Sequence, residues 1–348
     1  MNLRHRFAVT AIEAHHIPEA LFDAWPVQNW CMAKQANIII ADESALFFYE
    51  HIDTIGSCGA VIARNNPLAT SATNAEDLGR FNESHPLYGG LPVSILVRDS
   101  LSRRQSHSIK CRYCPDDLPS GSFYKLREGL YIVSPELLFV RMANLVSDVR
   151  LAEIGLNLCA RYYINLDSGG IDDRSVMLTT PAKLSKYMTK AEGIRGAGKA
   201  RKVLKWVVAN SGSPLESKMM IQYSLPFWAG GLNLPLTHMN YDVSAGRLAK
   251  MTEQSEFCID CVNPRLKVGL EYDGEAAHQD AGKDKRRINA LSALGWKVFS
   301  IDKSVFYDSE RTIQAALQIA RYLDMRLRWQ KSWRKRFNDL RKDLGLPA

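Results

Sequence analysis

The stretch LKVGLEYDGEAAH, residues 266–278, decides the interpretation of the C-terminal half of this chain. Its first five residues place apolar side chains at every second position, as in a strand with one buried face. Glu271 and Asp273 then follow at a spacing of two, so both carboxylates leave the same face of the strand. Like charges this close repel each other and raise each other's pKa unless a positive partner joins them. The pattern therefore predicts a partner for two carboxylates at a strand end.

A third carboxylate stands on the preceding strand. FCIDCV, residues 257–262, reads as a strand and is separated from the quoted stretch by a turn at Asn263–Pro264. A loop of two or four residues places Asp260 across from Gly269, on the face that carries Glu271. A loop of odd length turns Asp260 to the other face. With an even loop, three carboxylates converge at one end of a hairpin.

Three convergent carboxylates are the oxygen ligands that a hard divalent cation prefers. Mg²⁺ commonly takes one or two protein carboxylates together with waters and a substrate phosphate. Such an ion can activate water and stabilise the charge that develops on a phosphodiester in the transition state. The alternative is an acidic strand end that is merely solvated. The candidate ligands for Mg²⁺ or Mn²⁺ are Asp260, Glu271 and Asp273.

Two further residues are candidates for the same site. In SPLES, Ser213, Pro214 and Glu216 fit the N-cap, N1 and N3 positions of a helix. This capping box fully explains Glu216, although the same carboxylate could also reach the metal. His278 follows the acidic strand and could act as a general base or orient a phosphate. A lone histidine in a loop could equally be solvated.

Basic residues gather at two places. The first lies at the predicted start of a helix after residue 281, where the positive end of the helix dipole adds to the charge of these residues and favours an approaching phosphate. As an alternative, Asp284 and Arg287 could form an ion pair with each other, one helical turn apart. The second is the connector around residue 200, whose alternative is a solvated linker face. The candidate nucleic-acid-binding residues are Lys283, Lys285, Arg286, Arg287, Lys199, Arg201 and Lys202.

Composition supports a soluble protein with an anionic partner. The chain has 348 residues, 46% of them hydrophobic and 24% charged, as is typical of globular proteins. The net charge of +8 favours a polyanionic partner. No apolar run approaches the roughly 18 residues of a membrane span, so we expect no membrane partner. Seven cysteines suit a reducing compartment, and we expect a cytoplasmic location.

The two CxxC pairs, Cys111 with Cys114 and Cys258 with Cys261, raise the question of a zinc site. The second pair lies on a predicted strand, where positions three apart point to opposite faces. A zinc knuckle needs a tight turn instead. We therefore expect these cysteines to be small, buried apolar side chains.

The chain divides by pattern into four segments. Residues 1–180 mix short apolar runs that look like strands, including ANIIIADESALFFYE at 36–50, with a helix over 134–146, and suggest an α+β domain. Glycines split the basic connector, 181–210, into two helices. Residues 211–325 read as α-β-β-α-β-α, an α/β layer. The last segment, 326–348, is a basic helical tail.

The acidic residues and the helix that follows them carry a family resemblance. Their order resembles that of PD-(D/E)xK nucleases of the very-short-patch-repair-like branch, and in particular of bacterial proteins with the domain of unknown function 559. The match covers about residues 211–305. It consists of Glu216, Asp260, Glu271, Asp273, Gly274, His278, Asp284, Arg287, Leu291, Gly295 and Trp296.

The resemblance implies a restriction-endonuclease-like mixed sheet flanked by helices. It also implies a Mg²⁺- or Mn²⁺-dependent enzyme that hydrolyses phosphodiester bonds of nucleic acid, DNA in preference to RNA. The N-terminal part resembles the leading regions of such proteins in abortive-infection and toxin–antitoxin neighbourhoods, which suggests a setting in phage defence. The N-terminal half would then choose the target, sense a trigger or bind a protein partner.

The resemblance also implies roles for single residues. Asp260 and Glu271 would hold the metal, and Asp273 would complete or support that shell. Glu216 would add a ligand or position water. Contact with the phosphate would come from His278 and Arg287.

The sequence departs from the superfamily motif at two positions. Asp273 stands where the motif has a lysine, and Ile259 stands where it has a proline. Lys283, Lys285 or His278 could take over the role of the missing lysine. Two other functions therefore stay open: a non-catalytic nucleic-acid-binding regulator that kept the fold, and an interaction protein whose basic helices bind an acidic partner.

Overall fold

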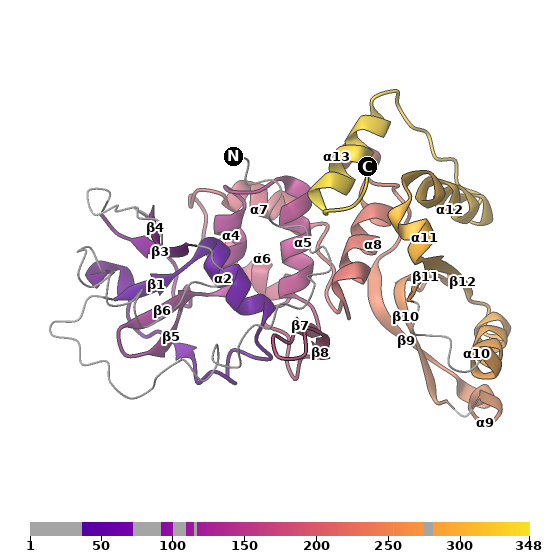
Figure 1. The fold of residues 1–348 in the computed structure, drawn as a ribbon, viewed down its shortest axis with the longest axis horizontal. Helices are drawn as coiled ribbons and strands as arrows, with labels where there is room; N and C mark the ends of the chain where they lie inside the picture. Colours follow the sequence, from indigo (N-terminus) through magenta and orange to yellow (C-terminus); the bar gives the residue numbers. More distant parts are fainter. Residues whose placement is uncertain (1–36, 72–91, 100–108, 115–116, 253, 275–280) are drawn as a thin grey trace. The chain divides into compact units, whose positions relative to one another are not determined.

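A computed structural model gives the fold of the chain (Figure 1). The chain divides into two compact units. The N-terminal unit takes its described residues from 37–146 and 161–205, and the C-terminal unit from 147–160 and 206–348. The structure describes residues 37–71, 92–99, 109–114, 117–252, 254–274 and 281–348.

A six-stranded mixed sheet organises the N-terminal unit, in the order β2-β5-β6-β1-β3-β4. The three isoleucines of β1 are completely buried at its centre, as the apolar run predicts. β1 runs parallel to β6 and antiparallel to β3. The strands are β1 (Ile38–Ile40), β2 (Val61–Ile62), β3 (Val93–Val97), β4 (Ile109–Tyr113), β5 (Phe123–Arg127) and β6 (Leu130–Val133), with a separate hairpin of β7 (Tyr162–Ile164) and β8 (Ile171–Asp173).

Helices complete the N-terminal unit. The helix predicted over 134–146 forms, as α4 (Pro135–Met142), and Ser134 caps it by accepting a hydrogen bond from the backbone N–H of Leu137 at 3.2 Å. The strand reading of 36–50 is wrong beyond residue 41, because α2 (Asp42–Glu50) follows β1 there. A short apolar run does not by itself separate strand from helix.

The basic connector forms two helices, as predicted, α6 (Pro181–Lys190) and α7 (Ala197–Leu204). Both belong to the N-terminal unit. Gly196 has a φ of 99°, and a Cβ there would lie 2.4 Å from the carbonyl oxygen of Val140 on α4. Only glycine allows this close approach, so the connector packs as part of the unit rather than forming an exposed linker.

A four-stranded mixed sheet organises the C-terminal unit, in the order β12-β11-β10-β9. β10 pairs antiparallel with both β9 and β11, whereas β11 and β12 are parallel. The helix α10 (Ala281–Ala293) supplies the crossover that a parallel pair needs. The strands are β9 (His238–Ser244), β10 (Glu256–Asn263), β11 (Val268–Asp273) and β12 (Lys297–Asp302).

The hairpin of β10 and β11 closes with a loop of four residues, because Asn263 pairs with Val268. The expectation that Asp260 lies across from Gly269 is wrong, since Gly269 pairs with Val262. The loop lies one position later in the chain than assumed, which moves the register by two. A shift of two leaves each side chain on its expected face.

Helices cover this sheet. Leu291 of α10 and Trp296 join Phe257 and Ile259 of β10 in one buried cluster. Across the described residues, no helix combines the length and the apolar character needed to cross a bilayer. The helices are α5 (Asp148–Leu158), α8 (Pro214–Ser224), α9 (Ala249–Thr252), α10, α11 (Lys303–Tyr307), α12 (Ser309–Tyr322) and α13 (Trp333–Asp343).

The basic tail forms a packed helix. In α13, Trp333 and Phe337 are buried, and the indole N–H of Trp333 donates to the carbonyl oxygen of Gly231 at 2.9 Å. Arg341 is completely buried, and its guanidinium donates to Gln222 Oε1 at 2.6 Å and to the carbonyl oxygen of Tyr307 at 2.7 Å. At least one basic residue of the tail therefore stabilises the fold instead of facing a partner.

Candidate functional site

The strands β10 and β11 stop pairing just where the acidic residues begin. Their last ladder pair is Cys261 with Leu270, and Asp260 is the next residue of β10. Its Oδ2 accepts a hydrogen bond from the backbone N–H of Tyr272 at 2.8 Å. The carboxylate thus supplies the acceptor that a continuing ladder would have offered. Asp260 is half-buried in the gap between the two strands.

Glu216 reaches the site from the start of α8. The capping box forms in a modified version: Ser213 Oγ accepts from the N–H of Glu216 at 3.2 Å, while Glu216 Oε2 accepts from the N–H of Gly212 at 2.8 Å. The same oxygen accepts from Asn240 Nδ2. The capping interpretation is therefore confirmed, and it holds the carboxylate in one orientation.

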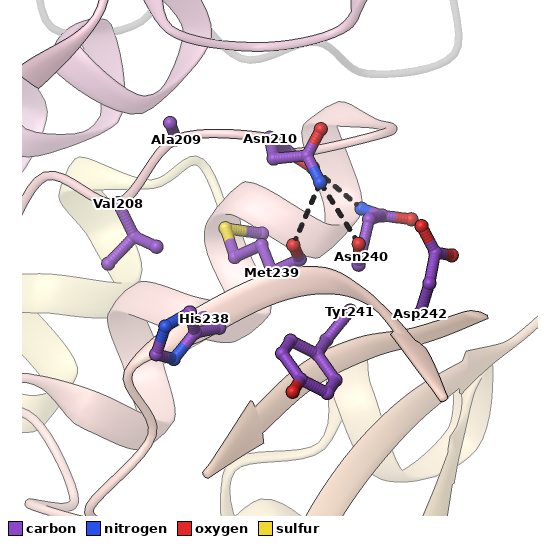
Figure 2. Close-up of a pocket in the computed structure, with 8 residues that line it drawn as sticks. All are labelled: Val208, Ala209, Asn210, His238, Met239, Asn240, Tyr241 and Asp242. Atoms are coloured by element: carbon purple, nitrogen blue, oxygen red, sulfur yellow. Dashed lines mark hydrogen bonds between the residues drawn. The ribbon is translucent and has the colours of Figure 1, made fainter. Parts of the chain in front are cut away.

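Asn240 is a functional candidate that sequence reasoning missed. It adopts a left-handed φ of 44°, as does Asn210 with 78°. Each asparagine donates to the backbone carbonyl of the other, at 3.0 and 2.9 Å (Figure 2). An open cavity of about 500 Å³ lies beside them. His238 and Tyr241 of β9 also line this cavity. Asparagine's tolerance of left-handed backbone was the only signal in the sequence.

Glu271 is held by an arginine. Arg287 Nη1 donates to Glu271 Oε2 at 2.7 Å, and Nη2 donates to Oε1. Nη2 also donates to the carbonyl oxygen of Cys258 at 2.8 Å, so the guanidinium bridges β10 and β11. Both side chains are half-buried. The ion pair raises the pKa of Arg287, chiefly through the hydrogen bond to Glu271, and keeps it charged.

The electrostatics of the site centre on Asp260. Burial raises its pKa to about 7, and the charges of Glu216 and Glu271 add to that rise. The hydrogen bond from Tyr272 and the charge of Arg287 act in the opposite direction without cancelling it. Three carboxylates thus act on one another here, with Arg287 as a nearby cation.

The thiol of Cys261 takes no charge. Cys261 is completely buried, and burial, then the charges of Asp260 and Glu216, raise its pKa well above the ordinary value. The expectation of a buried side chain is wrong for Cys258, which is exposed, because the two cysteines lie on opposite faces of the strand, as its pattern predicts. Buried neutral cysteine is neither a nucleophile nor a ready metal ligand.

Asp273 points toward the next strand. Its Oδ2 accepts a hydrogen bond from Ser300 Oγ of β12 at 3.2 Å. Asp273 pairs with Asp302 in the ladder, two positions beyond the pair of Glu271 with Ser300. These contacts are therefore with β12, on the side of β11 away from Asp260.

The predicted phosphate-binding residues fall into three groups. His278 lies outside the described residues, and so does the side chain of Lys283. Lys285 and Arg286 are exposed on α10. The third group belongs to the N-terminal unit, where Lys199 is half-buried and donates to the carbonyl oxygen of Val146, and Arg201 and Lys202 are exposed.

The site offers a divalent cation few ligands, because Arg287 occupies both oxygens of Glu271. Within the part of the chain that the structure describes, no three His, Cys, Asp or Glu side chains group as ligands of one ion. Mg²⁺ needs only one or two carboxylates, however, since water and substrate fill its other positions. The excess negative charge around Asp260 is what such a cation would offset. Asp260 and Glu271 are the residues that would hold it.

Comparison with known proteins finds no match. No protein-family model, no curated protein and no solved structure matches this chain. The function is therefore argued from the side chains around Asp260 and from the sheet that positions them.

Proposed function

We propose that the C-terminal unit is a restriction-endonuclease-like domain of the PD-(D/E)xK type, which hydrolyses phosphodiester bonds of nucleic acid with Mg²⁺ or Mn²⁺. The order α8-β9-α9-β10-β11-α10-β12, with a final parallel pair, supports this proposal. So does the place of the acidic residues, at the point where two central strands part.

One observation carries the proposal: Asp260 lies where the pairing of β10 and β11 ends, with its carboxylate fixed by the N–H of Tyr272 and with Glu216 and Glu271 close enough to act on it. Burial and these two charges raise the pKa of Asp260 to about 7. A fold gains nothing in stability from such crowding, because the charged form is disfavoured. Displaced pKa values of this kind gather at functional sites. When bound, a divalent cation would supply an activated water and stabilise charge on the phosphodiester.

The residues of this chain would prepare that site. The backbone N–H of Tyr272 fixes the direction of Asp260 by donating to its Oδ2, and Oδ1 would be the oxygen that binds the cation. Asn240 and Gly212 hold Glu216 in place, where it would orient a water. Exposed Lys285 and Arg286 would attract the phosphate backbone, which gives affinity that falls with salt. DNA is the preferred substrate, with cleavage largely independent of sequence.

The direct test is cleavage of plasmid and of single- and double-stranded oligonucleotides with Mg²⁺ or Mn²⁺. Asp260→Asn and Glu271→Gln should each lower the rate by about 100-fold or more, as loss of metal-supporting groups does. Glu256→Gln is the matched control, because Glu256 is an exposed carboxylate on the same strand. Cleavage that survives both site substitutions would refute the proposal.

A second candidate function has one observation in its favour. The ion pair with Arg287 occupies both oxygens of Glu271, and the motif's lysine is replaced by Asp273. A regulator that binds nucleic acid without cutting it could keep such a closed site. Calorimetry separates the two functions: tight DNA binding with no measurable Mn²⁺ affinity would favour the regulator.

A further inference from the structure

Three hydrogen bonds tie Arg287 to the two strands that frame the site. Two go to the carboxylate oxygens of Glu271 on β11, and the third goes to the carbonyl oxygen of Cys258 on β10 at 2.8 Å. A forked pair of this kind is the strongest arrangement that a guanidinium and a carboxylate can form. Arg287 is therefore placed by its own contacts at the mouth of the gap that holds Asp260.

This placement conflicts with cation binding at Glu271. Both carboxylate oxygens already accept hydrogen bonds from the guanidinium, so a cation must displace them to gain a ligand. Two positive charges at one carboxylate also repel each other, and the repulsion is stronger in a half-buried site than in water. The charge on Arg287 and the charge on the cation thus compete for the same anion.

Nucleic acid can resolve this competition. The guanidinium fork matches a phosphate as well as it matches a carboxylate. Lys285 and Arg286 are exposed on the same helix, so a phosphate backbone attracted to α10 arrives next to Arg287. A phosphate there offers Arg287 an alternative partner and leaves Glu271 available to the cation.

We propose that Arg287 is an internal counter-ion that holds Glu271 until a phosphate group of nucleic acid draws it away, so that nucleic acid and the divalent cation bind cooperatively. This inference rests on the proposed nuclease function and describes how nucleic acid would control cation binding at its site. By linkage, the factor by which nucleic acid raises the affinity for the cation equals the factor by which the cation raises the affinity for nucleic acid.

The first measurement is the affinity of the metal-free protein for Mn²⁺ by calorimetry. Arg287→Gln should bind Mn²⁺ about tenfold more tightly than the unchanged protein, which corresponds to about 1.4 kcal/mol. Arg287→Lys, which keeps the charge but loses the fork, should lie between them. Arg265→Gln is the matched control: it removes the same charge from the exposed loop that joins β10 and β11 and should change the affinity by less than about twofold.

The second measurement is the affinity for a short labelled DNA duplex with phosphorothioate linkages, by fluorescence anisotropy in EDTA and in Mn²⁺. Mn²⁺ should tighten binding about tenfold for the unchanged protein and for Arg265→Gln. For Arg287→Gln, the same comparison should differ by less than about twofold.

The outcomes separate this inference from the proposed function. If Arg287→Gln binds Mn²⁺ no more tightly than the unchanged protein, while cleavage still depends on Asp260, the counter-ion role is wrong and the nuclease stands. If no variant binds Mn²⁺, both proposals fall. Circular dichroism checks that Arg287→Gln is folded; if it is not, Arg287→Lys decides, and an affinity equal to that of the unchanged protein overturns the counter-ion role.

Discussion

Each unit holds a cluster of charged side chains just beyond a strand, and the two clusters are balanced differently. In the N-terminal unit, Asp42 follows β1 and is completely buried. Arg141 donates to both its oxygens, at 2.7 and 2.9 Å, and Arg112 lies 3.7 Å from Oδ2. Arg112 also donates to Glu43 at 3.3 Å. Two carboxylates therefore meet two arginines.

In the C-terminal unit, Glu216 and Glu271 both act on Asp260, and Arg287 is the arginine beside them among the described residues. In the first cluster the two arginines offset the two carboxylates, which is the condition for burying a charge such as that of Asp42. In the second, the described carboxylates outnumber the described arginine, and the pKa of Asp260 is raised. A balanced cluster indicates a structural role, whereas the excess of carboxylates in the second supports the proposed cation site.

The largest effect should come from unbalancing the N-terminal cluster. Arg141→Ala leaves Asp42 buried without its main partner and should lower the free energy of unfolding by about 3–5 kcal/mol. Urea denaturation followed by circular dichroism measures the change. Lys125→Ala removes an exposed ion pair with Glu128 from the same unit and should cost no more than about 1 kcal/mol. Equal losses in the two variants would show that the cluster is not structural.

Neutralising the C-terminal cluster should have the opposite sign. The folded pKa of Asp260, about 7, lies above its unfolded value, so the folded state binds the extra proton and stability falls as pH rises from about 4 to 7. Asp260→Asn removes this loss and should stabilise the metal-free protein by about 1–3 kcal/mol at pH 8. The gain should shrink toward zero near pH 4.

Urea denaturation in EDTA at both pH values tests this expectation, with Glu256→Gln as the exposed control on the same strand. Addition of Mn²⁺ at pH 8 should stabilise the unchanged protein and leave Asp260→Asn unaffected. A variant that is less stable than the unchanged protein at pH 8 would mean that the cluster is balanced after all.

The smallest expected effect shows how much of the raised pKa of Asp260 comes from the charge of Glu216. Glu216→Gln keeps an acceptor for the N–H of Gly212 but removes a charge that raises the pKa of Asp260. That pKa should fall, while stability should change by no more than about 1 kcal/mol. Carbon-13 NMR titration of labelled aspartate measures the pKa. No change would assign the shift to burial and to Glu271.

The sequence predicted much of the C-terminal sheet because its pattern is local. Alternation gave β10 and β11, and Ser213 with Pro214 gave the start of α8. The register was off by two because the turn residues do not fix which of several even loops forms. β9 was missed because HMNYDVS mixes polar side chains into an edge strand of the sheet.

The partners within the site could not be predicted in the same way. That Arg287 lies on Glu271 depends on how α10 packs over the sheet, a contact between residues 16 positions apart. The link from Glu216 to Asn240 depends on a backbone twist at one asparagine. Spacing shows which side chains share a face, but it does not show which charges satisfy one another.

The helix α5 belongs to the C-terminal unit, and this affects how the protein can be divided into recombinant fragments. The described chain enters and leaves the C-terminal unit around residues 147–160 before it returns at 206. Within that unit, Glu153 of α5 pairs with Lys218 of α8, both buried, at 4.0 Å. A recombinant piece that starts at 206 would expose this surface and remove Glu153 from the buried lysine. The C-terminal unit is thus not a segment that one cut can release, and gene fusions that exchange it must include α5.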